Sequence, residues 1–203
     1  MIKKFILIVT VLLPLKAFAL IEVDITRGNL DPLPLAVSPL SIDEKSRQSF
    51  KEILLKDNIG SEISQIVESN LRTSGLFNPL DKNAFLQAPD IAHIKPRFED
   101  WNLIKAQALI TGKVNYTGDK LRVEFRLWDV LAAKEMMALA FTTVPTNWRR
   151  VGHIISDKIY ERLTGERGYF DTRIIYVAEE GPKTERIKKL AIMDQDGFNN
   201  KFL

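Results

Sequence analysis

The sequence predicts an α/β domain in which helices pack on a mixed or antiparallel sheet, in two or three layers. Helical periodicity covers residues 57–74 and recurs over residues 148–163. Between these two segments, residues 108–144 show a period of two in three consecutive stretches. Amphipathic helices that flank a meander bury their apolar stripes by packing on it, which gives the fold class.

The first 19 residues are typical of a signal peptide. Lys3 and Lys4 precede an apolar run, Phe5 to Leu13, and Ala17-Phe18-Ala19 matches a small-residue cleavage site. The run is shorter than the about 20 residues that a membrane-spanning helix requires. We therefore expect export and a mature chain that begins at Leu20, and an uncleaved N-terminal anchor is the alternative.

Composition and charge exclude two classes of function. The formal charge of +3 falls to zero once the three lysines of residues 1–19 are removed, because no acidic residue leaves with them. A neutral mature chain lacks the attraction that drives nucleic-acid binding. The absence of cysteine excludes disulfides and thiolate metal sites, and 45% hydrophobic residues suffice for a sizeable core.

The mature N-terminus combines strand-forming residues with a break. Leu20 to Thr26 is mostly apolar, but Arg27 to Pro34 contains glycine, asparagine and two prolines, which prevent a regular element there. A short strand then resumes at Leu35 to Val37. We expect such a terminal segment either to dock on the domain or to detach from it. The alternative is that it forms the first strand of the sheet.

Two long helices are expected. The first spans Asp57 to Ser74, with Asp57 or Asn58 as N-cap and Gly75 at its end. The second runs to Leu163, with Thr146 as N-cap and Gly165 at its end. Shorter helical turns are expected at Phe50–Lys56 and Phe98–Lys105. The apolar stripes of the long helices are formed by Ile59, Ile63, Ile66, Val67 and Leu71, and by Trp148, Val151, Ile155, Ile159 and Leu163.

Three strands are expected between the helices, at Ala108–Thr117, Leu121–Val130 and Glu135–Val144, with a turn at Gly118-Asp119. In the middle strand apolar residues alternate with polar ones, so one face is packed. Trp128 lies on the other face, where it packs under a helix or faces outward. After the last helix, Thr172 to Val177 is a strand of a new sheet.

Candidates for chemistry are few. His93 and His153 are far apart in sequence, and no set of metal ligands or nucleophile with its partners stands at a recognisable spacing, so we expect no metal, cofactor or small-molecule substrate. Asp194 and Asp196 form the best carboxylate pair. Gly197 stands fourth in that stretch, whereas a calcium loop of the EF-hand type requires glycine at its sixth position, so we expect a hairpin turn.

Three stretches carry a family resemblance: Arg72 to Asp81, Gly152 to Val177, and Leu190 to Leu203, which contains the D-x-D-G-x-N turn Asp194–Asn199. They resemble the TolB family, in which a small α/β domain is followed by a six-bladed β-propeller. The resemblance implies a signal peptide (1–19), an N-terminal domain (20–170) and the start of a propeller (171–203), the last ending before one four-stranded blade is complete.

The resemblance also implies a function. TolB proteins are non-enzymatic periplasmic components of the Tol-Pal system, which link inner-membrane TolA to outer-membrane Pal for envelope integrity and invagination at division. The propeller binds Pal, and this chain contains at most its first strands. The alternative is a periplasmic hydrolase or carbohydrate-binding module that uses Asp194, Asp196 and a histidine. The residues implied in TolA binding are Glu22, Val23, Asp24, Ile25, Thr26, Arg27, Leu33 and Pro34.

Overall fold

The computed structural model describes residues 31–54 and 56–203, and it contains a six-stranded sheet and a separate three-stranded sheet. The larger sheet has the order β3-β1-β4-β5-β6, with β2 also pairing with β4. Its strands are β1 (Leu33–Val37), β2 (Ser41–Ile42), β3 (Phe77–Pro79), β4 (Ala108–Thr117), β5 (Lys120–Asp129) and β6 (Lys134–Thr143). The signal peptide and Glu22 to Arg27 lie outside the described residues.

The larger sheet is mixed. β1 and β2 run parallel to β4, and β3 runs parallel to β1. β4, β5 and β6 form an antiparallel meander, as the sequence predicts. β4 has the predicted bounds, and β5 and β6 each differ from the predicted bounds by one residue at both ends.

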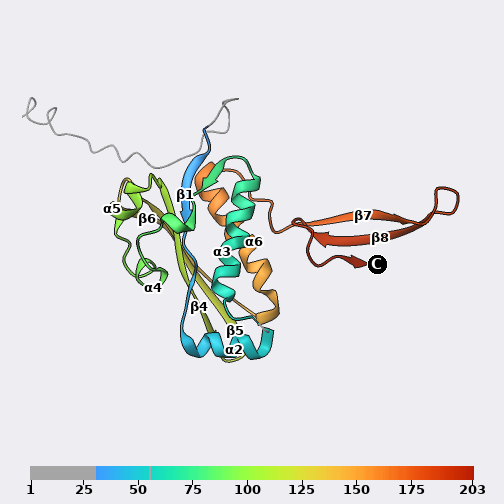
Figure 1. Cartoon of the computed structure of the whole chain (residues 1–203), viewed down its shortest axis with the longest axis horizontal. Helices are drawn as coiled ribbons and strands as arrows, with labels where there is room; N and C mark the ends of the chain where they lie inside the picture. Colours follow the sequence, from blue (N-terminus) through green and yellow to red (C-terminus); the bar gives the residue numbers. More distant parts are fainter. Residues whose placement is uncertain (1–30, 55) are drawn as a thin grey trace, which may run out of the picture.

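Helices cover both faces of this sheet, so the domain has three layers (Figure 1). α3 and α6 form the thick layer on one face, and the short helices α4 and α5 lie on the other. The helices are α2 (Glu44–Leu54), α3 (Ile59–Thr73), α4 (Pro89–Ala92), α5 (Phe98–Leu103) and α6 (Trp148–Thr164), with 3₁₀ turns η1 (Lys82–Ala84) and η2 (Pro145–Asn147).

Strand alternation divides the core in two. Leu35 and Val37 of β1 join the large cluster under α3 and α6, whereas Ala36 between them joins the smaller cluster around Trp101 of α5. Trp128 is on the α5 side: its ring meets Phe98 edge-on and its Nε1 donates to Thr111 Oγ1 at 2.9 Å. The sequence left this orientation open, and packing under a helix is the outcome.

The predicted helices are present, but several of their ends differ. Asn58 caps α3 by accepting from the Ser61 amide. α2 begins six residues before the predicted turn, because Asp43 accepts from the Ser46 amide and thereby caps it. Thr146 is not the N-cap of α6, since it lies inside η2 and Asn147 takes that position. The prediction that no regular element occurs before Leu35 was also wrong, because β1 includes Leu33 and Pro34.

The second sheet extends away from the α/β domain (Figure 1). It consists of β7 (Arg173–Glu180), β8 (Ile187–Asp194) and β9 (Lys201–Phe202), all antiparallel. Lys188 and Lys189 lie on β8, where they pair with Glu179 and Glu180. Among the described residues, no helix has both the length and the apolar character needed to cross a bilayer.

Candidate functional site at the junction of the two sheets

A buried polar network joins α3 to α6 at the point where the second sheet contacts the domain. Asn70 of α3 bonds His153 Nδ1 and Ser156 Oγ of α6, both at 2.9 Å. Ser156 Oγ in turn donates to the Gly152 carbonyl. Asn70 and His153 are each 3% exposed, so these bonds replace water as their partners.

The hairpin between β8 and β9 is the turn that the sequence predicts at Asp194–Asn199. Gly197 adopts a φ of 85°, which the missing Cβ permits, and its amide donates to the Asp194 carbonyl at 2.9 Å. Asp196 Oδ1 accepts from the Phe198 amide, and Asn199 donates to the Asp194 carboxylate. The acidic and amide side chains therefore shape the turn through local bonds.

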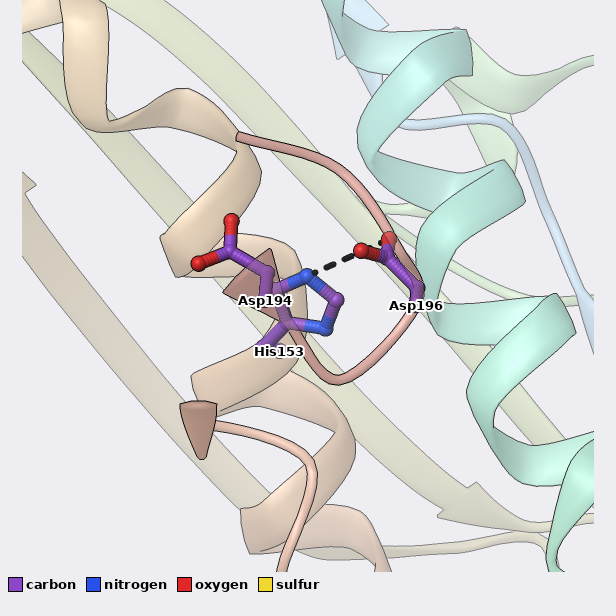
Figure 2. Close-up of side chains that lie close together, drawn as sticks. All are labelled: His153, Asp194 and Asp196. Carbon is purple, nitrogen blue, oxygen red and sulfur yellow. Dashed lines mark ion pairs between the residues drawn. The ribbon is translucent and has the colours of Figure 1, made fainter. Parts of the chain in front are cut away.

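This turn is docked on the α3–α6 pair. Gln195 Nε2 donates to Asn70 Oδ1 at 2.8 Å, which ties the turn to the buried network. Asp196 forms an ion pair with Arg149, and its Oδ2 lies 3.5 Å from His153 Nε2 (Figure 2). The Phe198 ring lies under the Arg149 guanidinium, with 3.7 Å between the ring centroid and Cζ.

The loop between α6 and β7 is fixed by α6 itself. Asp157 accepts from the amides of Phe170 at 2.6 Å and Asp171 at 3.1 Å. Arg150 donates hydrogen bonds to the Asp171 carboxylate from both Nε and Nη2. Phe170 is 1% exposed and belongs to the main core. The chain therefore enters the second sheet from an anchored position.

Burial sets the protonation of His153. It lowers the pKa of this imidazole below the ordinary value of 6.5, Asp196 opposes the shift, and Arg149 adds to it. The ring is therefore neutral at neutral pH. Its Nε2 and the Arg149 Nε are both buried, and neither has a hydrogen-bond partner among residues 31–54 and 56–203. A cavity of about 410 Å³ adjoins the cluster, and its lining includes Arg149, Arg150, His153, Asp171, Arg173 and Asp194.

The structure brings together residues that the sequence left apart. Asp157 stands four residues after His153 on α6, but its carboxylate binds the Phe170 and Asp171 amides. Asp194 and Asp196 of the distant turn flank the His153 ring instead (Figure 2). His93 is elsewhere, with its Nδ1 2.9 Å from the Asp90 carbonyl. Leu33 and Pro34 lie in β1, partly buried, and Glu22 to Arg27 lie outside the described residues.

Sequence reasoning missed Asn70, Arg149 and Gln195. Asn70 carried a usable signal, because it lies four residues after Ile66 and three after Val67, on the apolar face of α3. A polar residue at such a position requires a buried partner. Arg149 and Gln195 carried no such signal, since their roles depend on how the turn docks.

Comparison with known proteins gives consistent results. A family model described as the TolB amino-terminal domain matches residues 21–136, more than half of the chain. The Tol-Pal system protein TolB of Pelagibacter ubique (strain HTCC1062) is 77% identical over the whole of this chain, which covers 46% of that protein. The crystal structure of TolB from Acinetobacter baumannii superposes with a TM-score of 0.69 at 25% identity, over 89% of this chain and 40% of that one. The chain thus spans less than half the length of these relatives.

Proposed function

The chain belongs to the TolB amino-terminal domain family, and on that premise we propose that it is a non-enzymatic periplasmic interaction component of the Tol-Pal system. The 77% identity to a Tol-Pal system protein TolB across all 203 residues carries this proposal. We further propose export by a cleaved signal peptide (1–19), an interaction domain (20–170), and a segment (171–203) that supplies the first strands of a propeller.

The partner that we assign to the N-terminal segment is TolA. Glu22 to Arg27 would add a strand to a sheet edge of TolA, where main-chain hydrogen bonds give affinity and alternate side chains give selectivity. Leu33 and Pro34 would act as the anchor of this segment. Their backbone is already engaged, since the Leu33 amide donates to the Leu76 carbonyl and the Pro34 carbonyl accepts from the Gln107 amide, both at 2.9 Å.

The contact with outer-membrane Pal is assigned to the propeller side of the protein. In this proposal residues 171–203 provide part of that side, and the whole assembly links the two membranes during invagination at division. The docked turn supports a fixed geometry between the two parts, because Asp196, Gln195 and Asp157 each make a contact across or within the junction.

Calorimetric titration with the TolA C-terminal domain tests the assignment of TolA. We would compare the chain that begins at Leu20 with one that begins at Asp31, because the second keeps all of β1. Binding by the longer chain alone is the expected result. Equal binding by both would place the site elsewhere on the domain, and binding by neither would contradict the proposal.

A matched pair of variants tests the mode of binding. Asp24→Pro removes a backbone N–H and should abolish a strand-addition complex, whereas Asp24→Ala keeps the N–H and should retain most of the affinity. Asp196→Asn serves as a remote control that should leave the affinity for TolA unchanged. Loss of affinity for TolA in this control would place part of the TolA site at the Asp194–Asn199 turn, away from the N-terminal segment.

A further inference from the structure

The buried imidazole nitrogen Nε2 of His153, at the junction of the two sheets, has no hydrogen-bond partner among the described residues. His153 is 3% exposed. A buried polar atom without a partner costs about 1–3 kcal/mol. Nε2 points toward the docked turn, where Asp196 Oδ2 is 3.5 Å away. The atom is therefore placed to bind something that fits between the helix and the turn.

Two carboxylates lie close to this imidazole: that of Asp196 points at the ring, whereas that of Asp194 is turned away from it (Figure 2). Ligand atoms of His153, Asp194 and Asp196 all lie within 4.8 Å of one another. Two ligands of a tetrahedral ion with bonds of about 2.1 Å are about 3.4 Å apart. The 3.5 Å between His153 Nε2 and Asp196 Oδ2 matches this value. Asp194 would have to rotate away from Asn199 and Arg173, which hold its carboxylate, into the cavity that it lines beside α6.

We propose that His153 Nε2 and the carboxylates of Asp194 and Asp196 form a divalent-cation site, with Zn²⁺ as the ion that suits this ligand set. Zinc accepts one imidazole and two carboxylates with a solvent molecule in the fourth position. The ion would join α6 to the β8–β9 turn and thereby fix the second sheet on the domain. This role is separate from the binding of TolA, and it survives or fails independently of that assignment.

Metal binding requires one tautomer of His153. Nε2 can bind a cation only if Nδ1 carries the proton, so Nδ1 must then donate. At present the Asn70 amide nitrogen faces Nδ1, and its oxygen accepts from Gln195. A half-turn of both amides reverses these bonds: Asn70 Oδ1 accepts from Nδ1, and Asn70 Nδ2 donates to Gln195 Oε1. The Ser156 hydroxyl, which accepts from Asn70 Nδ2 and donates to the Gly152 carbonyl, must then donate to Asn70 Oδ1 instead. Asn70 is therefore a positioning residue for the ion.

Arg149 is the cation that competes for the site. Its guanidinium forms the ion pair with Asp196, and Arg173 lies 3.7 Å from Asp194. A divalent ion must displace Arg149 from Asp196, so the arginine weakens metal binding. Arg149 keeps other contacts if it leaves Asp196, since its Cζ lies 5.4 Å from the Trp148 ring centroid and 3.7 Å from that of Phe198.

Titration of the full chain with Zn²⁺ alone, by calorimetry, tests the site. The expected result is saturable binding of one ion per chain. His153→Gln should weaken it at least by the 10- to 100-fold that loss of a supporting partner typically costs, and Asp196→Asn should weaken it similarly. His93→Gln is the matched control, because it removes the other histidine and should leave the affinity unchanged.

Two further variants separate a metal site from a structural network. Arg149→Gln should tighten Zn²⁺ binding, although it removes an ion pair from the apo protein. Asn70→Ala should weaken binding, and Asn70→Asp should restore it because a carboxylate on Nδ1–H makes Nε2 a better ligand. Circular dichroism shows which variants fold, and Asp196→Asn on the exposed turn remains informative if His153→Gln does not. Absence of saturable binding, or equal binding by wild type, His153→Gln and Asp196→Asn, would overturn the proposal.

Discussion

Gly152 marks the closest approach of α3 and α6, and Gly152→Ala tests how tightly these helices are packed. A Cβ built at this position lies 2.9 Å from Ile66 Cγ2 and 3.0 Å from Ile66 Cβ. Carbon atoms in contact prefer about 3.5–4.0 Å. The two helices must therefore separate by about 0.5–1 Å, or Ile66 must leave its rotamer.

Two effects of opposite sign decide the change in stability. Overpacking of this kind costs about 1–3 kcal/mol. Alanine is favoured over glycine inside a helix by about 1 kcal/mol, which offsets part of that cost. Ile66 is 8% exposed and packed in the main core, so relaxation toward solvent is restricted. We expect the variant to be about 1 kcal/mol less stable than the wild type.

Urea unfolding measures this difference, and a double-mutant cycle identifies its cause. Ile66→Ala alone should cost about 2–5 kcal/mol by creating a cavity. Combined with Gly152→Ala it should cost less than the sum, because the new methyl group enters that cavity. Separation of α3 and α6 should also weaken the Asn70–His153 bond. The NMR signal of the His153 ring measures this change, and the signal of the His93 ring is the reference. A more stable Gly152→Ala variant, or strict additivity with Ile66→Ala, would refute the reasoning.

Two other predictions concern the same domain. Ser64→Ala should lower the free energy of unfolding in urea by about 1–3 kcal/mol, because the Leu40 amide loses its buried acceptor, Ser64 Oγ at 2.9 Å. A change below about 0.5 kcal/mol, the effect of an ordinary surface substitution, would argue against this. The hydrogen bond from the Ser46 amide lowers the pKa of Asp43 below its usual 3.8. The ionised carboxylate therefore stabilises the folded protein above that pH, and this stabilisation is lost as the pH falls through the lowered pKa. Asp43→Asn should therefore reduce the acid-induced loss of stability while costing little at pH 7, where asparagine also caps a helix; an unchanged pH profile would exclude Asp43 as a source.

The parts of the fold that follow local periodicity were predictable from the sequence. The stripe from Val151 to Leu163 and the alternation along β5 specify both the elements and their buried faces. β3 was not predictable, because three residues with a proline do not form a recognisable pattern, and they become a strand only by pairing with β1. The Asp194–Asn199 turn was predicted from its own residues, because its bonds are local.

The cluster of His153, Asp194 and Asp196 was not predictable either, and the reason is different. His153 and Asp196 are 43 positions apart and lie on separate elements, so no spacing rule connects them. Their meeting depends on where β8 and β9 place the turn, which in turn depends on the loop that Asp157 holds. Polar residues on apolar helix faces, such as Asn70 and Ser156, were the sequence signal that a buried partner must exist.

The same two helices thus serve the core and the contact with the second sheet. Asn70 contacts His153 and Ser156 on one side and Gln195 of the turn on the other, so a shift of α3 against α6 changes the surface on which the turn rests. A change in packing at Gly152 should therefore alter the docking of the turn, although no residue of β7, β8 or β9 is touched. Conversely, a cation bound between His153 and the turn should raise the stability of the α3–α6 pair by mass action. Thermal unfolding of the wild type and of Gly152→Ala, each with and without Zn²⁺, tests both statements. An equal Zn²⁺-dependent shift in these two proteins would disprove the coupling to Gly152, and an equal shift in wild type and His153→Gln would disprove the role of the cation.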